Sequence, residues 1–307
     1  MTHPKKLFCF GYGYSCDYLG HALEEAGGWS LAGTTRSADK KDKLNERGID
    51  AHIFDYQHPL VDPRFILDGV THVVISTPPD DAGDPSFSIH AQDILKIPTV
   101  EWVGYLSTTG VYGNRDGDWV DETTELIPTS QRGSRRKKAE GQWMSLCKSE
   151  GLPLHIFRLA GIYGPGRSAL DSIRAGVARR IEKPGHSFSR IHVEDIVRVL
   201  MASIANPDPG GVYNVCDDLP APSHEVIAHA CDLMGRPPPP LIPFTQADLA
   251  PITRSFYADN KRVRNDKIKN ELGVELKYQT YKEGLKGCLD AEDYAAKTLF
   301  SGMNQAK

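Results

Sequence analysis

Short apolar runs alternate with amphipathic segments through the first half of the chain. The apolar runs are bounded by Gly, Pro or Asp and predict strands at residues 7–10, 29–35, 49–54, 72–76, 100–107 and 154–159. The segments between them predict helices at residues 16–26, 38–47, 87–95 and 134–149. Because parallel neighbours need a crossover connection, this alternation predicts an α/β fold with a doubly wound parallel sheet and helices on both faces.

The pattern changes after residue 158. A loop-rich stretch at 161–167 leads through a helix to strand-like runs at 190–193 and 211–216, which flank a helix at 194–205, and a further helix follows at 223–234. Four prolines at 237–240 predict an extended spacer, since proline fixes φ and donates no hydrogen bond. We therefore expect a sheet domain of residues 1–160 completed by 191–217, a smaller α/β region of 161–190 and 218–300 that carries the substrate side, and a tail at 301–307.

Length and charge narrow the class of protein. The 307 residues predict about two domains, and 36 basic against 40 acidic residues give a net charge of -4. This balance argues against nucleic acid or an anionic membrane as a partner and leaves a small-molecule substrate. The six cysteines lie far apart, so we expect a reducing, cytoplasmic location. We expect no metal site, because the two histidines of His224-Glu225-Val-Ile-Ala-His229 are five positions apart and lie about 140° apart around a helix.

A glycine-rich turn follows the first predicted strand. Gly11 and Gly13 occupy the first two positions of G-x-G-x-x-G, Tyr14 follows them, and Cys16 stands at the third glycine position. Glycines let the backbone approach a pyrophosphate, while the N-terminus of the next helix supplies free N–H groups. Dinucleotide binding is the favoured interpretation, and an ordinary strand-to-helix turn is the alternative.

The end of the second predicted strand bears on which dinucleotide is bound. No Asp or Glu occurs between residues 29 and 38, where an NAD site usually places an acidic residue for the ribose. Arg36, flanked by Thr35 and Ser37, instead offers a site for a 2'-phosphate, which favours NADP over NAD. A solvated arginine is the alternative. Asp55, after the third strand, is either an acceptor for the adenine amine or a turn residue.

Several segments together resemble the extended short-chain dehydrogenase/reductases, the NAD-dependent epimerase/dehydratase family. The segments are the glycine turn and residues 76–79, 105–113, 120–122, 158–167, 190–195 and 212–215, so the resemblance runs to about residue 285. It implies a Rossmann-type NAD(P)-binding domain, contacts of Ser76, Thr77 and Pro78 with the cofactor, and a C-terminal substrate domain. It also implies that a homodimer is to be expected.

The same resemblance exposes a departure at the catalytic positions. It implies that Thr108 hydrogen-bonds the reacting oxygen of the substrate. The family's central acid/base pair is a tyrosine followed four residues later by a lysine, and anchoring on Ala139-Glu140 places Arg132 and Arg136 at these positions. Arginine stays protonated, so neither residue is an ordinary acid/base. Two other Tyr-x-x-x-Lys matches, Tyr257 to Lys261 and Tyr278 to Lys282, lie far from the required helix, and we interpret them as accidental.

Other residues are candidates for the missing roles. Tyr163, Tyr112 and His192 are candidate proton donors by position, whereas the alternative makes the tyrosines pocket walls and the histidine structural. Arg132 and Arg136 share one helical face and, with Arg167, predict a site for a phosphate or carboxylate; a solvated basic run is the alternative.

Two functions fit these observations. The first is an NADP(H)-dependent oxidoreductase or epimerase-like enzyme that acts on a small polar substrate, either anionic or like a sugar nucleotide. The second is an NADP(H)-sensing regulatory module without catalysis. The missing tyrosine–lysine pair favours the second function, and the intact series of substrate-loop motifs favours the first.

Overall fold

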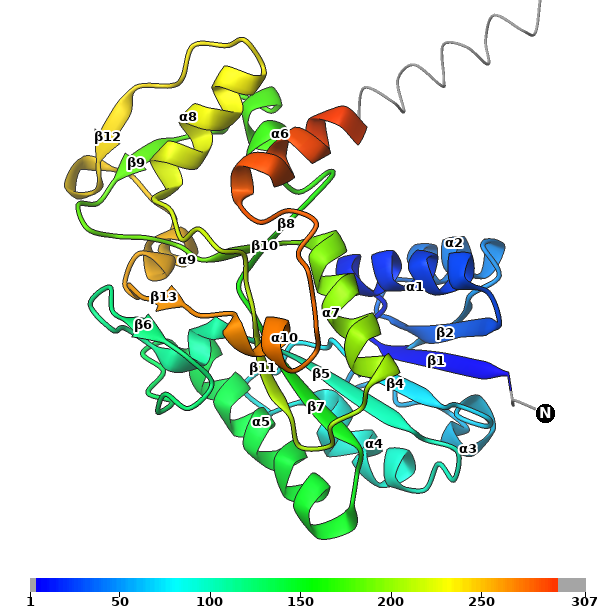
Figure 1. Ribbon diagram of the computed structural model, residues 1–307. Helices are drawn as coiled ribbons and strands as arrows, with labels where there is room; N and C mark the ends of the chain where they lie inside the picture. The colour runs from blue at the N-terminus through cyan, green and yellow to red at the C-terminus, as the bar shows by residue number, and fades with distance from the viewer. Residues whose placement is uncertain (1–3, 292–307) are drawn as a thin grey trace, which may run out of the picture.

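A seven-stranded parallel sheet forms the centre of the molecule. The computed structural model describes residues 4–291. The strands are β1 (Lys5–Phe10), β2 (Trp29–Thr35), β3 (Asp50–Ile53), β4 (His72–Ile75), β5 (Trp102–Thr108), β7 (Leu154–Leu159) and β11 (Val212–Val215). Their order, β11-β7-β5-β4-β1-β2-β3, turns back at β1, so the sheet is doubly wound (Figure 1). The predicted α/β class and Rossmann-type sheet are confirmed.

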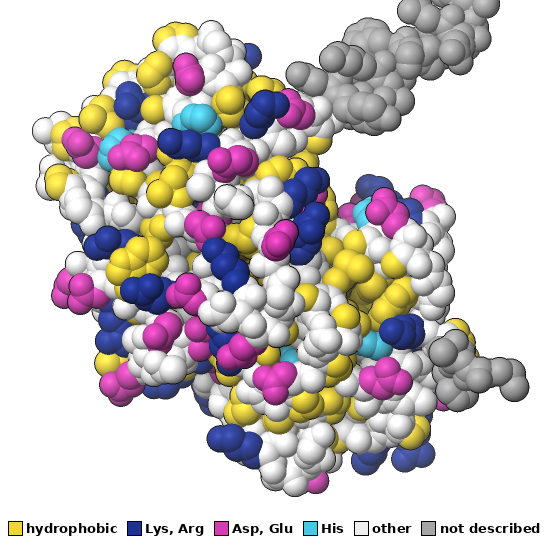
Figure 2. All heavy atoms as spheres, in the orientation of Figure 1, with side chains coloured by type: hydrophobic (Ala, Val, Ile, Leu, Met, Phe, Trp, Pro, Cys, Tyr) yellow, Lys and Arg dark blue, Asp and Glu magenta, His cyan; other side chains and the backbone are white. Residues whose placement is uncertain are grey.

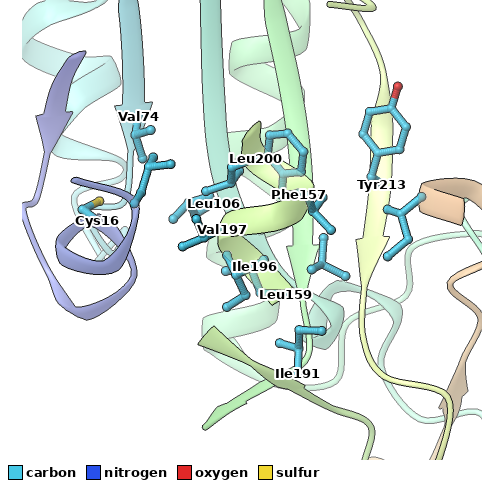
Figure 3. Close-up of a cluster of buried hydrophobic side chains, with 14 of the residues drawn as sticks. Cys16, Val74, Leu106, Phe157, Leu159, Ile191, Ile196, Val197, Leu200 and Tyr213 are labelled. Atoms are coloured by element: carbon cyan, nitrogen blue, oxygen red, sulfur yellow. The ribbon is translucent and has the colours of Figure 1, made fainter. Parts of the chain in front are cut away.

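Helices cover both faces of this sheet because side chains along each strand alternate between the faces. Leu7 and Cys9 of β1 pack in one core, together with side chains of α1 (Tyr14–Ala26), α2 (Ala38–Glu46) and α7 (Val193–Ala205). Phe8 and Phe10 point to the other face, which α3 (Pro63–Ile66), α4 (Pro85–Leu95) and α5 (Gln131–Glu150) cover. In the close-up of the first core, Ile196, Val197 and Leu200 of α7 lie beside Leu106 and Leu159 of the sheet (Figure 3).

A smaller lobe adjoins the sheet. It comprises β8 (Gly161–Tyr163), α6 (Ala169–Arg174), β9 (Arg180–Glu182), β10 (Arg190–His192), α8 (Ser223–Leu233), β12 (Leu241–Pro243), η2 (Phe244–Gln246), α9 (Pro251–Phe256) and a helix over residues 281–291. Leu170, Val226 and Leu285 meet in its core. Figure 1 shows α6, α8, β9 and β12 gathered together, apart from α1 and α2. The predicted α/β character of this region is confirmed.

One late segment, residues 257–270, returns to the sheet domain. β6 (Trp119–Val120), which follows the 3-10 helix η1 (Thr109–Tyr112), pairs in parallel with β13 (Arg262–Val263), and α10 (Asp266–Asn270) follows. Neither two-residue strand was predicted, since two residues show no periodicity. The pairing places residues near 260 beside the loop that follows β5, although about 140 residues of chain separate them.

The division of the chain into domains stays a prediction. Both β11 and α7 lie with the sheet, while residues 292–300 and the predicted tail at 301–307 are outside the described residues. No disulfide joins any of the six cysteines, all of which lie within the described residues. Within residues 4–291, every helix is too short or too polar to cross a membrane.

Candidate active site

A cavity of about 770 Å³ lies between the sheet and the smaller lobe. Pro78 after β4, Thr108 at the end of β5 and Ala160 after β7 place it at the carboxyl ends of the strands, where open α/β sheets bind ligands. The sheet domain and its loops contribute residues 78–79, 107–110, 130, 132, 133, 136, 159 and 160 to its wall. The lobe and the late segment contribute residues 161–163, 167, 187–190, 223, 253, 255–257, 259, 261 and 263.

The glycine turn has the geometry that a pyrophosphate needs. Gly11 has a φ of +84°, and a Cβ atom on it would lie 3.1 Å from the backbone nitrogen of Thr77. Its own N–H donates to Thr34 Oγ1 at 2.8 Å, which holds the turn against β2. Gly13 begins α1 without a side-chain cap, whereas Ser37, Asp84 and Ser130 cap α2, α4 and α5. The first turn of α1 therefore keeps its N–H groups for an anion, and these residues fit a dinucleotide.

Side chains around this turn make contacts within the protein. Cys16 is buried, and its thiol hydrogen-bonds the Cys9 thiol, so the third motif position serves the contact between helix and sheet. Tyr14 donates from its hydroxyl to the carbonyl of Pro165 at 2.9 Å. The guanidinium of Arg167 lies 5.7 Å from the centre of the Tyr14 ring. Tyr14 thus joins the start of α1 to the loop after β8.

The predicted adenosine-side residues follow β2 and β3. Arg36 is exposed and makes no hydrogen bond or ion pair within residues 4–291, so its guanidinium is available. Thr35 is buried, and Ser37 caps α2 by accepting from the Lys40 N–H at 3.3 Å. Asp55 accepts from the N–H groups of Gln57 and His58, and the bond from the His58 ring is the main cause that lowers the pKa of the Asp55 carboxyl. These are the contacts of a turn residue, which was the alternative interpretation of Asp55.

The strand-end residues 76–78 lie beside the glycine turn. The Ser76 N–H donates to the carbonyl of Phe10 at 2.8 Å, and Thr77 Oγ1 shares a hydrogen bond of 2.6 Å with Ser86. Pro78 lines the cavity. These contacts fix the loop where the predicted cofactor contacts require it.

The two arginines at the catalytic positions both face the cavity. α5 begins at Gln131, so Arg132 and Arg136 lie on its first two turns and four residues apart. Arg136 Nη1 donates to the Leu106 carbonyl at 2.9 Å and to the Tyr105 hydroxyl at 3.1 Å. The guanidinium of Arg132 lies 4.6 Å from the centre of the Phe256 ring. Thr108 also lines the cavity, and its Oγ1 accepts from the Gly110 N–H at 3.1 Å.

The charge of the cavity differs from that of the chain. Its charged lining side chains within residues 4–291 are Arg132, Arg136, Arg167, Arg190, Lys261 and a single carboxylate, Asp259. On the face in Figure 2, by contrast, positive and negative side chains are interspersed. The cavity concentrates positive charge inside a protein of net charge -4.

The three predicted proton donors are all engaged in the core. The Tyr163 hydroxyl is buried without a partner among the described residues and lies against Gly284, where a Cβ would come within 1.9 Å. Tyr112 donates to Asn214 Oδ1 at 2.7 Å and accepts from Arg158, and burial raises its pKa to about 12. His192 caps α7 by accepting from the Glu194 N–H at 3.2 Å. Tyr112 and His192 are absent from the cavity wall, whereas Tyr163 lines it, which is the pocket-wall role given as the alternative for the tyrosines. The cap contact of His192 is the structural role that was its alternative.

A buried ion pair supports the wall of the cavity. Ser107, which lines the cavity, donates to Glu140 Oε1 at 2.5 Å. Arg158 donates to the other oxygen of Glu140 at 2.9 Å, and both side chains are almost fully buried. Because a buried charge is stable only when it is paired, this network fixes the end of β5 next to Thr108.

Sequence reasoning missed the residues that the late segment contributes. Tyr257, Asp259 and Lys261 line the cavity, and the pairing of β13 with β6 brings them there. The Tyr257 to Lys261 match is the sequence signal that could have found these residues, although it lies far along the chain from α5. The second match is different, since Tyr278 bonds to Glu194 and is absent from the cavity wall.

The chain resembles known proteins in both sequence and fold. Residues 91–216 match the model of the "NAD dependent epimerase/dehydratase family". A functionally unknown conserved protein from Silicibacter pomeroyi is 51% identical with a TM-score of 0.86, over 93% of this chain and 98% of that one. Protein YeeZ of Escherichia coli is 25% identical over 286 residues, which cover 89% of this chain and 96% of YeeZ. A dTDP-glucose 4,6-dehydratase from Bacillus anthracis shares the fold, with 16% identity, a TM-score of 0.73 and 94% and 96% of the two chains covered.

Proposed function

Because this chain belongs to the NAD-dependent epimerase/dehydratase family, we propose that it is an NADP(H)-dependent oxidoreductase or epimerase-like enzyme whose substrate is small, polar and anionic. The observation that carries the proposal is the cavity at the strand ends, which is lined by five positive side chains. The open N-terminus of α1 lies near it, since Gly11 packs against Thr77, the residue before Pro78 of the cavity wall. Sugar nucleotides belong to this substrate class. The dinucleotide, when bound, supplies or accepts a hydride.

The cofactor part of the proposal rests on the glycine turn and on Arg36. Gly11 and Gly13 leave room for a pyrophosphate, and the N–H groups of α1 would hold it. The B. anthracis neighbour is described in complex with NAD. We favour NADP because the unpaired guanidinium of Arg36 follows β2, where a 2'-phosphate would lie.

The substrate part rests on the cavity. A volume of about 770 Å³ lies within the ordinary range for small-molecule sites. Thr108 would donate its hydroxyl hydrogen to the reacting oxygen, while Arg132 and Arg167 would bind the anionic group. Arg136 bonds protein oxygen atoms, so its part would be to add positive charge to this wall.

Binding of NADPH and NADH to the Arg36→Ala variant tests the proposal. We expect the natural protein to bind NADPH more tightly than NADH. The variant should lose about 10- to 100-fold in NADPH affinity, since a hydrogen bond to a charged group contributes about 1.5–3 kcal/mol. NADH affinity should stay unchanged, and both affinities can be measured by isothermal titration calorimetry.

Arg64→Ala is the matched control, because Arg64 is exposed on α3, away from the cavity. Equal losses for NADPH and NADH in Arg36→Ala would contradict the NADP assignment. If neither nucleotide binds to the natural protein, the proposed function is wrong.

The second candidate function is an NADP(H)-sensing module. The absence of Tyr112 and His192 from the cavity wall and the burial of the Tyr163 hydroxyl support it, because those three were the predicted proton donors. Nucleotide binding without turnover of carbonyl compounds or sugar nucleotides would favour the sensor over the enzyme. A cytoplasmic location, supported by the six cysteines that form no disulfide within the described residues, and a homodimer, supported by the family resemblance, belong to both candidates.

A further inference from the structure

Within residues 4–291, the cavity wall contains one basic side chain that is not an arginine. Among the described lining residues, four of the five positive side chains are arginines, which stay protonated. Lys261 is the fifth, and its side chain is 11% exposed. It enters the cavity from the late segment, opposite the start of α5, where the family's tyrosine and lysine positions carry Arg132 and Arg136.

The backbone around Lys261 is fixed from several sides. The carbonyl of Asn260 accepts from the N–H groups of Arg115 and Gly117 at 2.9 and 3.1 Å. The side chain of Asn260 bonds Gly185 and Ser187 of the lobe, at 2.9 and 3.1 Å. β13 begins immediately after Lys261 and pairs with β6. A catalytic group needs this kind of support, because an error of about 1 Å in its position reduces the rate strongly.

One carboxylate orients the ammonium. Lys261 Nζ lies 3.7 Å from Asp259 Oδ2, and the other oxygen of Asp259 accepts from the hydroxyl of Thr129, which immediately precedes the cap of α5. The backbone carbonyl of Asp259 bonds the His186 ring at 3.0 Å. The Asp259 carboxylate thus links the late segment to α5, and Lys261 lies at this junction.

The protonation of Lys261 follows from its surroundings. Burial lowers the pKa of the ammonium below its ordinary value, Asp259 opposes this shift, and the Arg115 guanidinium adds to it. The neutral amine is therefore accessible at a lower pH than for a solvated lysine. The other charged or titratable groups nearby are His186, from the loop after β9, and Lys183, which bonds the Tyr257 carbonyl.

We propose that Lys261 is the residue that exchanges a proton with the substrate, in the role that the tyrosine fills in typical family members; this rests on the proposed function. In carbonyl reduction, the carbonyl carbon gains the hydride while the oxygen takes a proton from the Lys261 ammonium, leaving a neutral amine. In alcohol oxidation, the neutral amine accepts the hydroxyl proton. Solvent restores the starting protonation state in either direction.

Labelling with pyridoxal 5'-phosphate tests this without a known substrate. Its aldehyde condenses with a neutral amine, water leaves, and borohydride reduces the imine to a stable secondary amine. Peptide mass spectrometry then gives the rate at each lysine. We expect Lys261 to react at least fivefold faster than Lys282 at pH 7.5, since Lys282 is the exposed lysine of the second Tyr-x-x-x-Lys match.

Two controls define the result. Pyridoxal without phosphate should label Lys261 more slowly than the phosphate ester, because the arginines attract the phosphate, yet still faster than it labels Lys282. A Lys261 rate equal to or below that of Lys282 with both reagents would overturn the proposal. This outcome is independent of NADPH binding, so it is distinguishable from failure of the proposed function.

Kinetic measurements on Lys261 variants distinguish proton exchange by this side chain from a requirement for its positive charge alone. With a carbonyl substrate found by NADPH oxidation, both Lys261→Met and Lys261→Arg should lower kcat by about 100-fold or more, as expected for loss of general acid/base catalysis. The dissociation constant for NADPH should stay within about twofold, which also shows that the variants fold. If Lys261→Arg keeps kcat near the natural value, only a positive charge is needed and the proposal is wrong.

Discussion

His192 shows how burial turns a titratable side chain into a structural one. Its Nδ1 atom accepts from the Glu194 N–H at the start of α7, and its Nε2 atom lies 3.5 Å from the Cys288 thiol. Burial is the main cause that lowers the pKa of the imidazole to about 4; Glu194 opposes this shift, and Lys277 contributes to it. The ring is therefore neutral in the folded protein at neutral pH. Its contribution is to stability, and it changes with pH.

Substitution of His192 should reduce the pH dependence of stability. Between pH 6.5 and about 4 the unfolded chain binds a proton at this position and the folded protein does not, so the free energy of unfolding falls as pH decreases through that range. His192→Asn keeps a cap acceptor and removes the titration. The slope of unfolding free energy against pH should decrease by up to about 1.4 kcal/mol per pH unit, as measured by urea unfolding.

The prediction concerns the difference in this slope between the natural protein and His192→Asn. Asp217, whose pKa burial raises to about 8, makes the folded state bind more protons and acts in the opposite direction. Asp217 is present in both the natural protein and His192→Asn, so its contribution to the slope cancels in the difference. The exposed His21 provides the control variant His21→Asn, and an equal change of slope in both variants would contradict the role assigned to His192.

At the scale of elements, α4 and α5 are joined through one carboxylate. Asp84 caps α4 by accepting from the N–H groups of Ser86 and Phe87, and its second oxygen accepts from Trp143 Nε1 of α5 at 2.8 Å. Asp84 is 1% exposed, and Trp143 is fully buried. This contact holds α5, and with it Arg132 and Arg136, against the sheet.

Loss of this carboxylate should cost more than loss of an ordinary cap. Asp84→Ala removes the cap, at about 1 kcal/mol, and leaves the Trp143 N–H unpaired, at about 1–3 kcal/mol. We expect the free energy of unfolding to fall by about 2–4 kcal/mol in urea. Asp62→Ala, which removes the exposed cap of α3, should cost about 1 kcal/mol or less. Equal losses would show that the bond to Trp143 contributes little.

Local patterns predicted the parts of the fold that depend on local chain geometry. β1, the glycine turn and α1 follow from neighbouring residues, because an apolar strand, two glycines and an amphipathic helix specify that unit. β6 and β13 escaped prediction because each is two residues long and is stabilised by its partner. The same distance in sequence hid Lys261, since no local pattern shows that its neighbour Asn260 bonds Arg115 and Gly117.

At the scale of the whole molecule, ligand binding and stability are linked. The cavity wall combines loops of the sheet domain with the lobe and the late segment, so a ligand there contacts parts of the chain that unfolding separates. A ligand that binds only the folded protein stabilises it by RT ln(1 + [L]/Kd).

NADPH should therefore raise the free energy of unfolding. At a concentration 100 times its Kd the increase should be about 2.7 kcal/mol, and NADH at the same concentration should give less. In Arg36→Ala the increase from NADPH should drop to that from NADH. Urea unfolding with and without each nucleotide measures these values, and identical increases in the natural protein would argue against selection by Arg36.

The β6–β13 pairing also determines when the cavity is completed during synthesis. The last strand of the seven-stranded sheet ends at Val215, whereas the wall that carries Lys261 needs the chain as far as Val263. A nascent chain can thus contain every strand of the central sheet while its strand ends still face open solvent. Closure of the cavity therefore has to wait for residues near 262, which return to a loop made about 140 residues earlier.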